Sequence, residues 1–263
     1  MRLRLVIAYV GTGYMGWQVQ AQHLAMQTIQ GQLEHALQLL AGQEVRVHGS
    51  GRTDSGVHAE RQVAHCDFPE DRYARLKDMR NSLNALLPCD IRVFAVQPCE
   101  RNFHARFDAH NKTYRYRFWQ ERGFVPPALK PYVWCCGPLD VAAVREALPH
   151  LLGEHDFACL ANAGTTGQES TVRTLYALEL NENTVWEGCA PMLELFVTGS
   201  GFLKQMVRNM AGLLAEIGRG KVGSSDVPRI LESRSRTALP APTAPASGLT
   251  LMCVEYGKGH GKA

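Results

Sequence analysis

The chain holds 263 residues, of which 45% are hydrophobic and 20% charged, and 28 Lys and Arg against 25 Asp and Glu give a formal charge of +3. These values are typical of a folded protein with one large domain or two smaller ones, and they argue against extended disorder. No apolar stretch approaches the about 18–20 residues that cross a bilayer, and the first residues alternate charged and apolar side chains unlike a signal peptide, so we expect a cytoplasmic protein.

Hydrophobic periodicity predicts alternating strands and helices in the first hundred residues. The expected strands are residues 3–9, 44–48, 62–68 and 91–96, and the expected helices are residues 27–41 and 75–87. Residues 49–56 carry three glycines and predict a loop between two strands.

The same patterns predict a second round of strands and helices. The expected strands are residues 112–119, 171–180, 192–198 and 249–256, and the expected helices are a segment capped by Asp140, residues 202–217 and a short turn at 227–231. We expect the tail beyond Tyr256 to be frayed. Antiparallel-type strands mixed with helices indicate an α+β fold with helices packed on one side of the sheets, and a boundary between two halves near residues 100–110.

The segment His48–Ala59 is a candidate chemical site, because a glycine-laced loop there holds one carboxylate, Asp54, close to one guanidinium, Arg52. Glycines allow tight turns and the close approach of a ligand. The spacing alone favours a simpler interpretation, in which Asp54 caps neighbouring amides of a turn.

A basic and aromatic segment covers residues 101–122, where six Lys and Arg face two acids for a local charge of +4. Basic side chains bind phosphates and aromatic rings stack on bases, so this pattern is typical of an RNA surface. The alternative is a solvated strand face over an aromatic core, which we favour for Tyr116 and Phe118.

A third segment, Gly199–Met210, predicts a turn followed by a helix with Met206 and Met210 on its apolar stripe. Arg208 lies half a turn away from that stripe. A lone helical arginine is usually a surface residue.

Residues 11–16 match the dinucleotide-binding pattern G-x-G-x-x-G and follow a strand. That pattern also requires a helix that opens at the glycines, whereas here the helical periodicity starts only near Gln27, so the match is weak. The eight cysteines form no C-x-x-C pair and are expected to be reduced and mostly buried, and the histidines lack metal-ligand spacing, so we predict no metal site.

Together these segments resemble the TruA-type tRNA pseudouridine synthases along nearly the whole chain. The strings that carry the resemblance are Tyr9–Gln18, Gly51–His58, Phe103–Phe107, Tyr114–Tyr116, Met206–Asn209 and Ala244–Leu249. Val10, Lys204 and Gln205 depart from the usual family pattern.

The resemblance implies two similar α/β halves, with mixed, mainly antiparallel sheets that meet at a central cleft and helices on the outer face. It implies residues 1–103 as the half with the aspartate loop and residues 104–263 as the half with the tyrosine strand and the arginine helix. It also implies a homodimer without a cofactor that converts uridines 38, 39 and 40 of the tRNA anticodon stem-loop to pseudouridine.

The resemblance assigns roles to particular residues as well. It implies Asp54, Tyr114 and Arg208 as catalytic residues and Arg52 as the residue linked to base flipping. The further RNA-binding positions are His104, Arg106, Arg72 and Arg122.

The chemistry of these residue types suits the reaction. An ionised Asp54 could attack either C1′ of the ribose or C6 of the base, and a neighbouring arginine would keep it ionised by lowering its pKa. The Tyr114 ring could stack on the detached uracil, and its phenol could help to remove the C5 proton. Two other classes of protein stay open at this point, a non-catalytic RNA-binding protein and a nucleotide-dependent oxidoreductase that uses residues 11–16.

Overall fold

The computed structural model describes residues 1–19, 25–162, 170–185 and 187–257. The chain divides into two compact units. One comprises Met1–Asn111 and the chain from Leu251 onward, and the other comprises Lys112–Thr250. Each unit combines a mainly antiparallel sheet with helices, so the predicted α+β class is confirmed.

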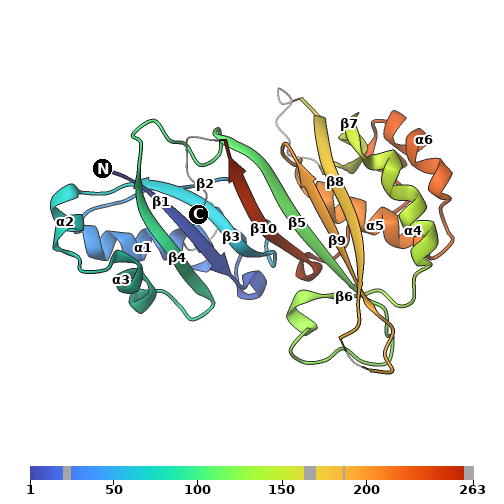
Figure 1. Ribbon diagram of the computed structural model, residues 1–263, viewed down its shortest axis with the longest axis horizontal. Coiled ribbons are helices and arrows are strands. Elements are labelled where there is room, and N and C mark those ends of the chain that lie inside the picture. Colours follow the sequence, from blue (N-terminus) through green and yellow to red (C-terminus); the bar gives the residue numbers. More distant parts are fainter. Residues whose placement is uncertain (20–24, 163–169, 186, 258–263) are drawn as a thin grey trace. The chain divides into compact units, whose positions relative to one another are not determined.

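The sheet of the first unit is built around β1 (Arg2–Tyr9), which pairs antiparallel with β3 (His58–Asp67) and β4 (Ile91–Cys99). β2 (Val47–Gly49) pairs with β3, and β10 (Leu249–Tyr256) lies on the other side of β3 from β1. The helices of this unit are α1 (Ile29–Ala41), α2 (Glu70–Arg75) and α3 (Met79–Leu86), together with 3-10 helices at Gly11–Gly13 and Ala25–Gln27 (Figure 1).

The core of the first unit includes apolar residues of β1 and α1, and β1 is buried on both faces from Leu3 to Ile7. Leu5 and Ile7 of β1 and Leu33 and Leu37 of α1 are all fully buried, as the helical and strand periodicities require. The guanidinium carbon of Arg4 lies 4.7 Å from the ring centre of Tyr256 and 5.8 Å from that of Phe103.

The second unit contains the antiparallel neighbours β5 (Ala109–Trp119), β9 (Met192–Gly199), β8 (Val172–Asn183) and β7 (Gly153–Asp156), in that order, and β6 (Trp134–Cys135) parallel to β5. Its helices are α4 (Val141–Ala147), α5 (Met206–Gly218) and α6 (Val227–Glu232) (Figure 1). The 3-10 helices are Lys130–Tyr132, Leu148–Leu151, Ala158–Leu160, Ser224–Asp226, Arg236–Ala238 and Ala246–Gly248.

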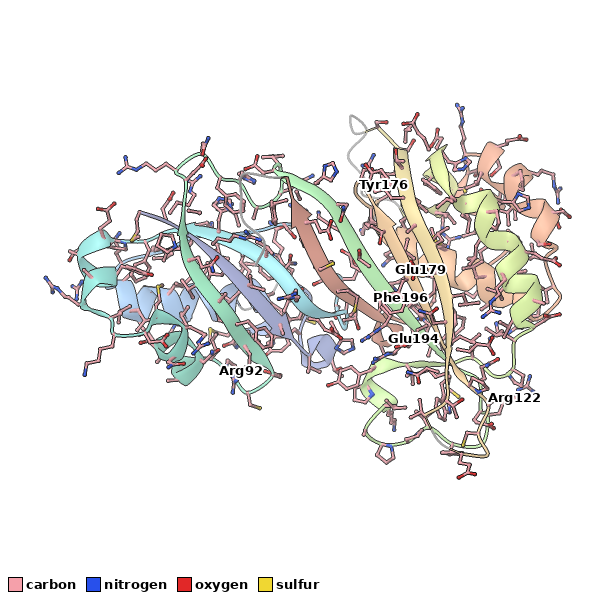
Figure 2. All side chains as sticks on the ribbon, viewed as in Figure 1. Arg92, Arg122, Tyr176, Glu179, Glu194 and Phe196 are labelled. Carbon is pink, nitrogen blue, oxygen red and sulfur yellow. The ribbon has the colours of Figure 1, made fainter. Side chains whose placement is uncertain are left out.

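The two faces of β5 differ as the sequence alternation predicts. Tyr116 and Phe118 are fully buried in the aromatic core, and the Tyr116 hydroxyl donates to the carbonyl of Pro245 at 2.8 Å. On the opposite face Arg117 Nε lies 2.7 Å and Arg115 Nε 3.6 Å from Oε1 of Glu194 on β9 (Figure 2). The interpretation of Tyr116 and Phe118 as core residues is therefore confirmed.

Two predicted helices begin later than their periodicity suggested. The helix predicted from residue 75 starts at Met79, because the Asp78 side chain accepts a hydrogen bond from the Asn81 amide and caps it there. The helix predicted from residue 202 starts at Met206, because Gln205 adopts a left-handed φ of 60° that ends the preceding turn.

Other strands were predicted at about the right places, but some of their bounds differ from the predicted ones. β10 has the predicted bounds, whereas β3 begins four residues before the predicted strand, at His58. The short strand predicted at residues 44–48 lies instead at Val47–Gly49. Nearly all of the tail predicted to fray lies outside the described residues.

The prediction for the cysteines was half right. All eight are free thiols, but only Cys66, Cys136 and Cys159 are buried, and Cys89 and Cys135 are exposed. The longest described helices, α1 and α5, have 13 residues each, and no described helix is long and apolar enough to cross a membrane.

Candidate active site

Asp54 lies in a tight turn between β2 and β3 in the first unit. The Val57 amide donates to the Asp54 carbonyl at 3.2 Å, and Gly56 takes a positive φ of 80° that closes the turn. Asp54 is half-buried and Arg52 is exposed. The carboxylate is therefore displayed on a short, constrained loop with a guanidinium two residues away.

The segment after β1 holds both neighbours of Asp54 in the chain. The Trp17 amide donates to the Thr53 carbonyl at 3.0 Å, and the Ser55 hydroxyl donates to the Tyr14 carbonyl at 3.0 Å. The Thr53 hydroxyl also lies 2.8 Å from the buried hydroxyl of Tyr9. Burial raises the pKa of Tyr9 to about 12, so its hydroxyl stays protonated and can donate this hydrogen bond.

The glycines of residues 11–16 permit this close packing. A Cβ on Gly11 would lie 2.0 Å from the Val57 carbonyl oxygen, and Gly16 combines a φ of 95° with a Cβ position 2.8 Å from the Thr53 carbonyl oxygen. Gly11–Gly13 forms a 3-10 helix, and α1 begins only at Ile29. The segment therefore lacks the helix N-terminus of a dinucleotide site, and Gly11 and Gly16 pack against the Asp54 loop.

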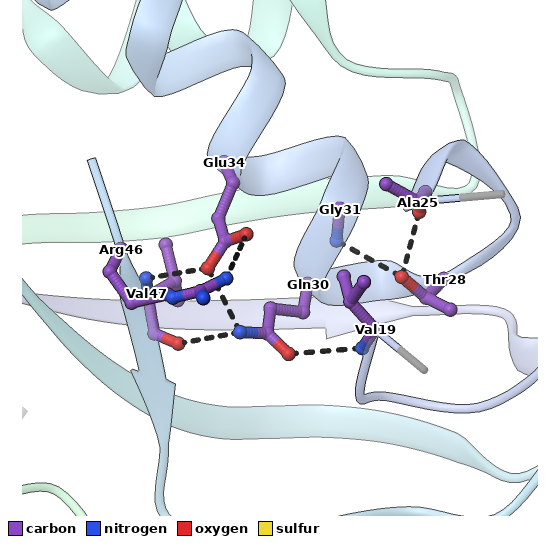
Figure 3. A network of polar contacts seen from close by, with 8 residues as sticks. All are labelled: Val19, Ala25, Thr28, Gln30, Gly31, Glu34, Arg46 and Val47. Carbon is purple, nitrogen blue, oxygen red and sulfur yellow. Dashed lines mark hydrogen bonds and ion pairs between the residues drawn. The ribbon is translucent and has the colours of Figure 1, made fainter. Parts of the chain in front are cut away.

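Helix α1 fixes the strand that leads into the Asp54 loop. Figure 3 shows Glu34 and Gln30 of α1 bonded to Val47 of β2. Glu34 Oε1 accepts from the Val47 amide at 3.0 Å, and Gln30 Nε2 donates to the Val47 carbonyl at 3.1 Å. Thr28 caps the start of the helix by accepting from the Gly31 amide at 3.1 Å.

Two buried polar residues, which the sequence patterns do not predict, hold the first residues of the loop. Ser50 Oγ donates to Gln62 Oε1 at 2.6 Å, and Gln62 Nε2 donates to the Gly51 carbonyl at 3.0 Å. Both side chains are fully buried. The only available signal was a polar residue at an inward position of a predicted strand.

Tyr114 lies on β5 in the second unit and is 8% exposed. Its ring meets the Phe202 ring edge to face, with centroids 5.0 Å apart. This packing fixes the orientation of the Tyr114 ring, since edge-to-face geometry is a preferred aromatic arrangement.

Arg208 lies in the first turn of α5 and is half-buried rather than a plain surface residue. Its Nε donates to the Ala244 carbonyl at 2.8 Å, and the Ala244 amide donates to the Arg208 carbonyl at 3.2 Å. A Cβ on Gly212, one turn further, would lie 2.0 Å from the Pro242 carbonyl oxygen. The proline-rich segment, which carries Pro240, Pro242 and Pro245, therefore packs directly on α5 and holds the Arg208 guanidinium in one orientation.

A polar network anchors the same end of α5. Asn209 is fully buried, and its Nδ2 donates to the Leu160 carbonyl at 2.7 Å and to Asn162 Oδ1 at 2.9 Å. Its Oδ1 accepts from the Thr243 hydroxyl at 2.6 Å, and Arg236 Nη2 donates to the same hydroxyl oxygen at 3.1 Å. This network links the start of α5, where Arg208 lies, to the segment around Thr243, and only the tertiary structure reveals it.

The remaining predicted RNA-binding residues lie on separate elements. His104 is half-buried and Arg106 is exposed in the turn before β5. Arg72 on α2 lies 4.0 Å from Asp71 and beside Gly42, and the exposed Arg122 packs against Gly137 in the second unit (Figure 2). Among the residues that the structure describes, no group of three His, Cys, Asp or Glu side chains is arranged to hold a metal.

Three histidines from separate segments of the first unit pack together as a histidine cluster, in which His48 stacks on His65 and His104 meets His65 edge to face. The ring centroids of His48 and His65 are 5.0 Å apart and those of His65 and His104 are 4.7 Å apart. His65 is buried, and its Nδ1 accepts from the Ala105 amide at 3.1 Å. Burial, His104, His48 and Arg2 together lower the pKa of His65 to about 4, against the opposing influence of Asp67.

Comparison with known proteins identifies the class of protein. The family model described as tRNA pseudouridine synthase matches residues 5–108 and 147–257. A tRNA pseudouridine synthase A of Maridesulfovibrio salexigens is 47% identical, with 98% of this chain and 91% of that protein covered. A tRNA pseudouridine synthase A of Citrifermentans bemidjiense is 43% identical, with 97% of each chain covered.

These matches define an isomerase that modifies RNA. The chain belongs to the tRNA pseudouridine synthase family, as the resemblance noted in the sequence implies.

The glycine packing around Asp54 predicts unequal effects of two alanine substitutions in residues 11–16. Gly11→Ala should lower the free energy of unfolding by about 1–3 kcal/mol, because the new methyl group overlaps the Val57 carbonyl. Displacement of the Asp54 loop should also lower kcat for pseudouridine formation by about 10-fold to 100-fold. Urea unfolding and single-turnover kinetics measure the two effects.

Gly13→Ala is the matched control, since nothing lies within 4 Å of a Cβ at that position. We expect near wild-type stability and kinetics for it. Equal effects of the two substitutions would contradict the packing role assigned to Gly11.

The histidine cluster predicts a loss of stability in mild acid. Unfolded chain takes up a proton on His65 near pH 6.5, whereas folded chain does so only near pH 4, so the unfolded state binds more protons between these values and stability falls as pH falls. His65→Asn keeps an acceptor for the Ala105 amide without a titrating group. The urea midpoint of this variant should fall less between about pH 7 and about pH 5 than that of the wild type.

His150→Asn removes an exposed histidine of the second unit and should keep the wild-type pH dependence. An unchanged pH dependence in His65→Asn would assign the acid sensitivity to other groups.

Proposed function

We propose that this chain isomerises uridines 38, 39 and 40 in the anticodon stem-loop of tRNA to pseudouridine, with Asp54 as the nucleophile. The observation that carries the proposal is the family match over residues 5–108 and 147–257, which includes the constrained loop of Asp54 and the helix of Arg208. The relatives that share 43–47% identity are named tRNA pseudouridine synthase A, which supports tRNA as the substrate.

The reaction needs a nucleophile and proton transfer but no net co-reactant. The bond between N1 of uracil and C1′ of ribose breaks, the base turns, and C5 bonds to C1′. The C5 proton leaves and N1 gains a proton, so atoms and charge balance. One carboxylate can form and later release the covalent intermediate, whether it attacks C1′ or C6.

Asp54 suits this role because its loop is constrained on both sides. Hydrogen bonds to Thr53 and Ser55 and the close approach of Gly11 and Gly16 leave the loop little freedom. A preorganised nucleophile loses less entropy on reaching the reacting atom.

Arg208 and Tyr114 complete the proposed catalytic set. The bond from Arg208 Nε to the Ala244 carbonyl orients the guanidinium that we propose as the partner of the Asp54 carboxylate. We propose that the detached uracil stacks on the fixed ring of Tyr114 while it turns, and that the Tyr114 phenol helps to remove the C5 proton.

A base in a stem must leave its stack before it can react, which costs a few kcal/mol. We propose that Arg52, exposed two residues from the nucleophile, fills the vacated space. His104, Arg106, Arg72 and Arg122 are proposed to contact the RNA, so the affinity should fall with salt. We further propose a cytoplasmic homodimer, with the aspartate loop in residues 1–103 and the tyrosine strand and arginine helix in residues 104–263.

The first test of this function is Asp54→Asn, assayed by tritium release from tRNA labelled at uracil C5, with no cofactor added. We expect turnover to fall about 10³-fold or more, because an amide is a poor nucleophile. Binding of tRNA in a filter assay should persist, since phosphate contacts dominate RNA affinity.

Glu44→Gln is the control, because it removes an exposed carboxylate from the same unit. Retained tritium release by Asp54→Asn would remove Asp54 from its role. Absence of release from the wild type, with tRNA binding intact, would leave an RNA-binding protein instead.

The second test is Arg208→Lys. A lysine keeps the charge but cannot reproduce the planar fork or the Nε bond to Ala244, so we expect kcat to fall about 10²-fold. Arg229→Lys, at an 80% exposed arginine on α6, should leave kcat unchanged. Equal and near-normal kinetics for the two variants would argue against a catalytic role for Arg208.

A further inference from the structure

Phe107 has an exposed aromatic ring that lies next to His104, at the end of the histidine cluster of His48, His65 and His104. Its side chain is 75% exposed, the largest exposed fraction among the large hydrophobic residues that the structure describes. Its ring centroid lies 4.3 Å from that of His104, with an interplanar angle of 34°. One side of the ring is therefore supported by protein, and much of the rest faces solvent.

The turn that carries Phe107 is rigidly closed around His104. Nδ1 of His104 accepts from the amides of Arg106 at 3.1 Å and Phe107 at 3.3 Å. Asp108 Oδ2 accepts from the His104 amide at 2.8 Å, and the Asp108 amide donates to the His104 carbonyl at 3.1 Å. The ring is thus displayed in a set position, which lowers the entropy lost when it binds a flat partner.

The rings beneath His104 are fixed as well. His104 packs on His65, and the Ala105 amide donates to Nδ1 of His65. On the inner side of the turn the buried Phe103 contacts Tyr256, whose hydroxyl donates to the Ala105 carbonyl at 2.7 Å. These contacts join the exposed ring to the core of the first unit.

The charge beside Phe107 favours an anionic partner. The guanidinium carbon of Arg106 lies 5.7 Å from the Phe107 ring centre. Arg101 in the same segment is 90% exposed, and its Nη2 lies 4.0 Å from Oε1 of Glu70. The carboxylate of Asp108 accepts from the His104 amide and is therefore directed into the turn. A flat apolar face next to cations suits a nucleobase with its phosphate better than an apolar peptide.

We propose that Phe107, supported by His104, is a stacking platform for an unpaired base of tRNA, and that Arg106 binds the adjacent phosphate. This inference rests on the proposed function for its ligand, but it concerns binding and not the isomerisation step. It adds a base contact to a set of RNA-binding residues that otherwise consists of charged or polar side chains.

The experiment measures the Kd of an unmodified tRNA transcript for the full chain over a series of salt concentrations. Phe107→Leu should raise Kd by about 5-fold to 100-fold, the range for a lost base stack, without changing the salt dependence. Phe107→Trp should bind within about 2-fold of wild type, because tryptophan also stacks. Arg106→Gln should instead reduce the slope of log K against log salt by about one phosphate contact.

Phe94→Leu is the matched control, because Phe94 on β4 is 59% exposed in the same unit and should leave Kd unchanged. Wild-type affinity in Phe107→Leu, equal weakening in Phe94→Leu, or failure of Phe107→Trp to restore binding would overturn the platform. A change of sedimentation on losing Phe107, with tRNA affinity intact, would assign the ring to contact between copies of the chain and also overturn it.

The outcome is separable from the proposed function. Wild-type protein that binds tRNA through Phe107 but releases no tritium would retain the platform and refute the isomerase assignment. Normal tritium release together with tRNA binding that does not depend on Phe107 would support the isomerase assignment and refute the platform.

Discussion

The close approach of two backbone segments in the first unit is the constraint on which the candidate nucleophile depends. The carbonyls of Val57 and Thr53 lie where side chains at positions 11 and 16 would otherwise stand, so only glycine allows the contact. The hydrogen bonds of Trp17 and Ser55 then act over short, well-defined distances. A reactive carboxylate on a loop is useful only when its loop is held, and here backbone packing holds it more than side-chain charge does.

In the second unit the candidate arginine must also be held in position, and a helix and a hydrogen bond hold it there. Arg208 is on a helix, which gives a rigid base, but a long guanidinium side chain retains several rotatable bonds. The bond from its Nε to Ala244 removes much of that freedom, and the network of Asn209, Thr243 and Arg236 holds the proline-rich segment that supplies the carbonyl. Prolines in that segment reduce its flexibility before folding as well as after it.

Local periodicity was sufficient for much of the fold. β10 and the two faces of β5 followed from alternation alone, because a strand's side-chain period is a local property. The start of α5 did not follow, since the left-handed Gln205 breaks a helical pattern that the apolar residues continue. The contacts that hold the candidate site in place were harder still to predict from the sequence. The glycine pattern of residues 11–16 suggests phosphate binding by spacing, and only its contact with Val57, more than forty positions later, shows that it packs against another loop. The contacts of Gln62 with Ser50 and Gly51 likewise required knowledge of which strands pair.

Net charge poorly describes how such a protein can recognise RNA. A charge of +3 over 263 residues gives little long-range attraction, and at physiological salt it is screened within about 8 Å. Recognition must therefore come from local groups whose positions are set before the RNA arrives. The turn at 104–108 meets this requirement, because it places a cation beside an aromatic ring and His104 accepts from the backbone amides of both residues. Stacking also tolerates any base, since every base has a π face, so a platform of this kind adds affinity without restricting which tRNA is bound. The proposed isomerisation of uridines 38, 39 and 40 would need that combination of tight binding and low sequence preference.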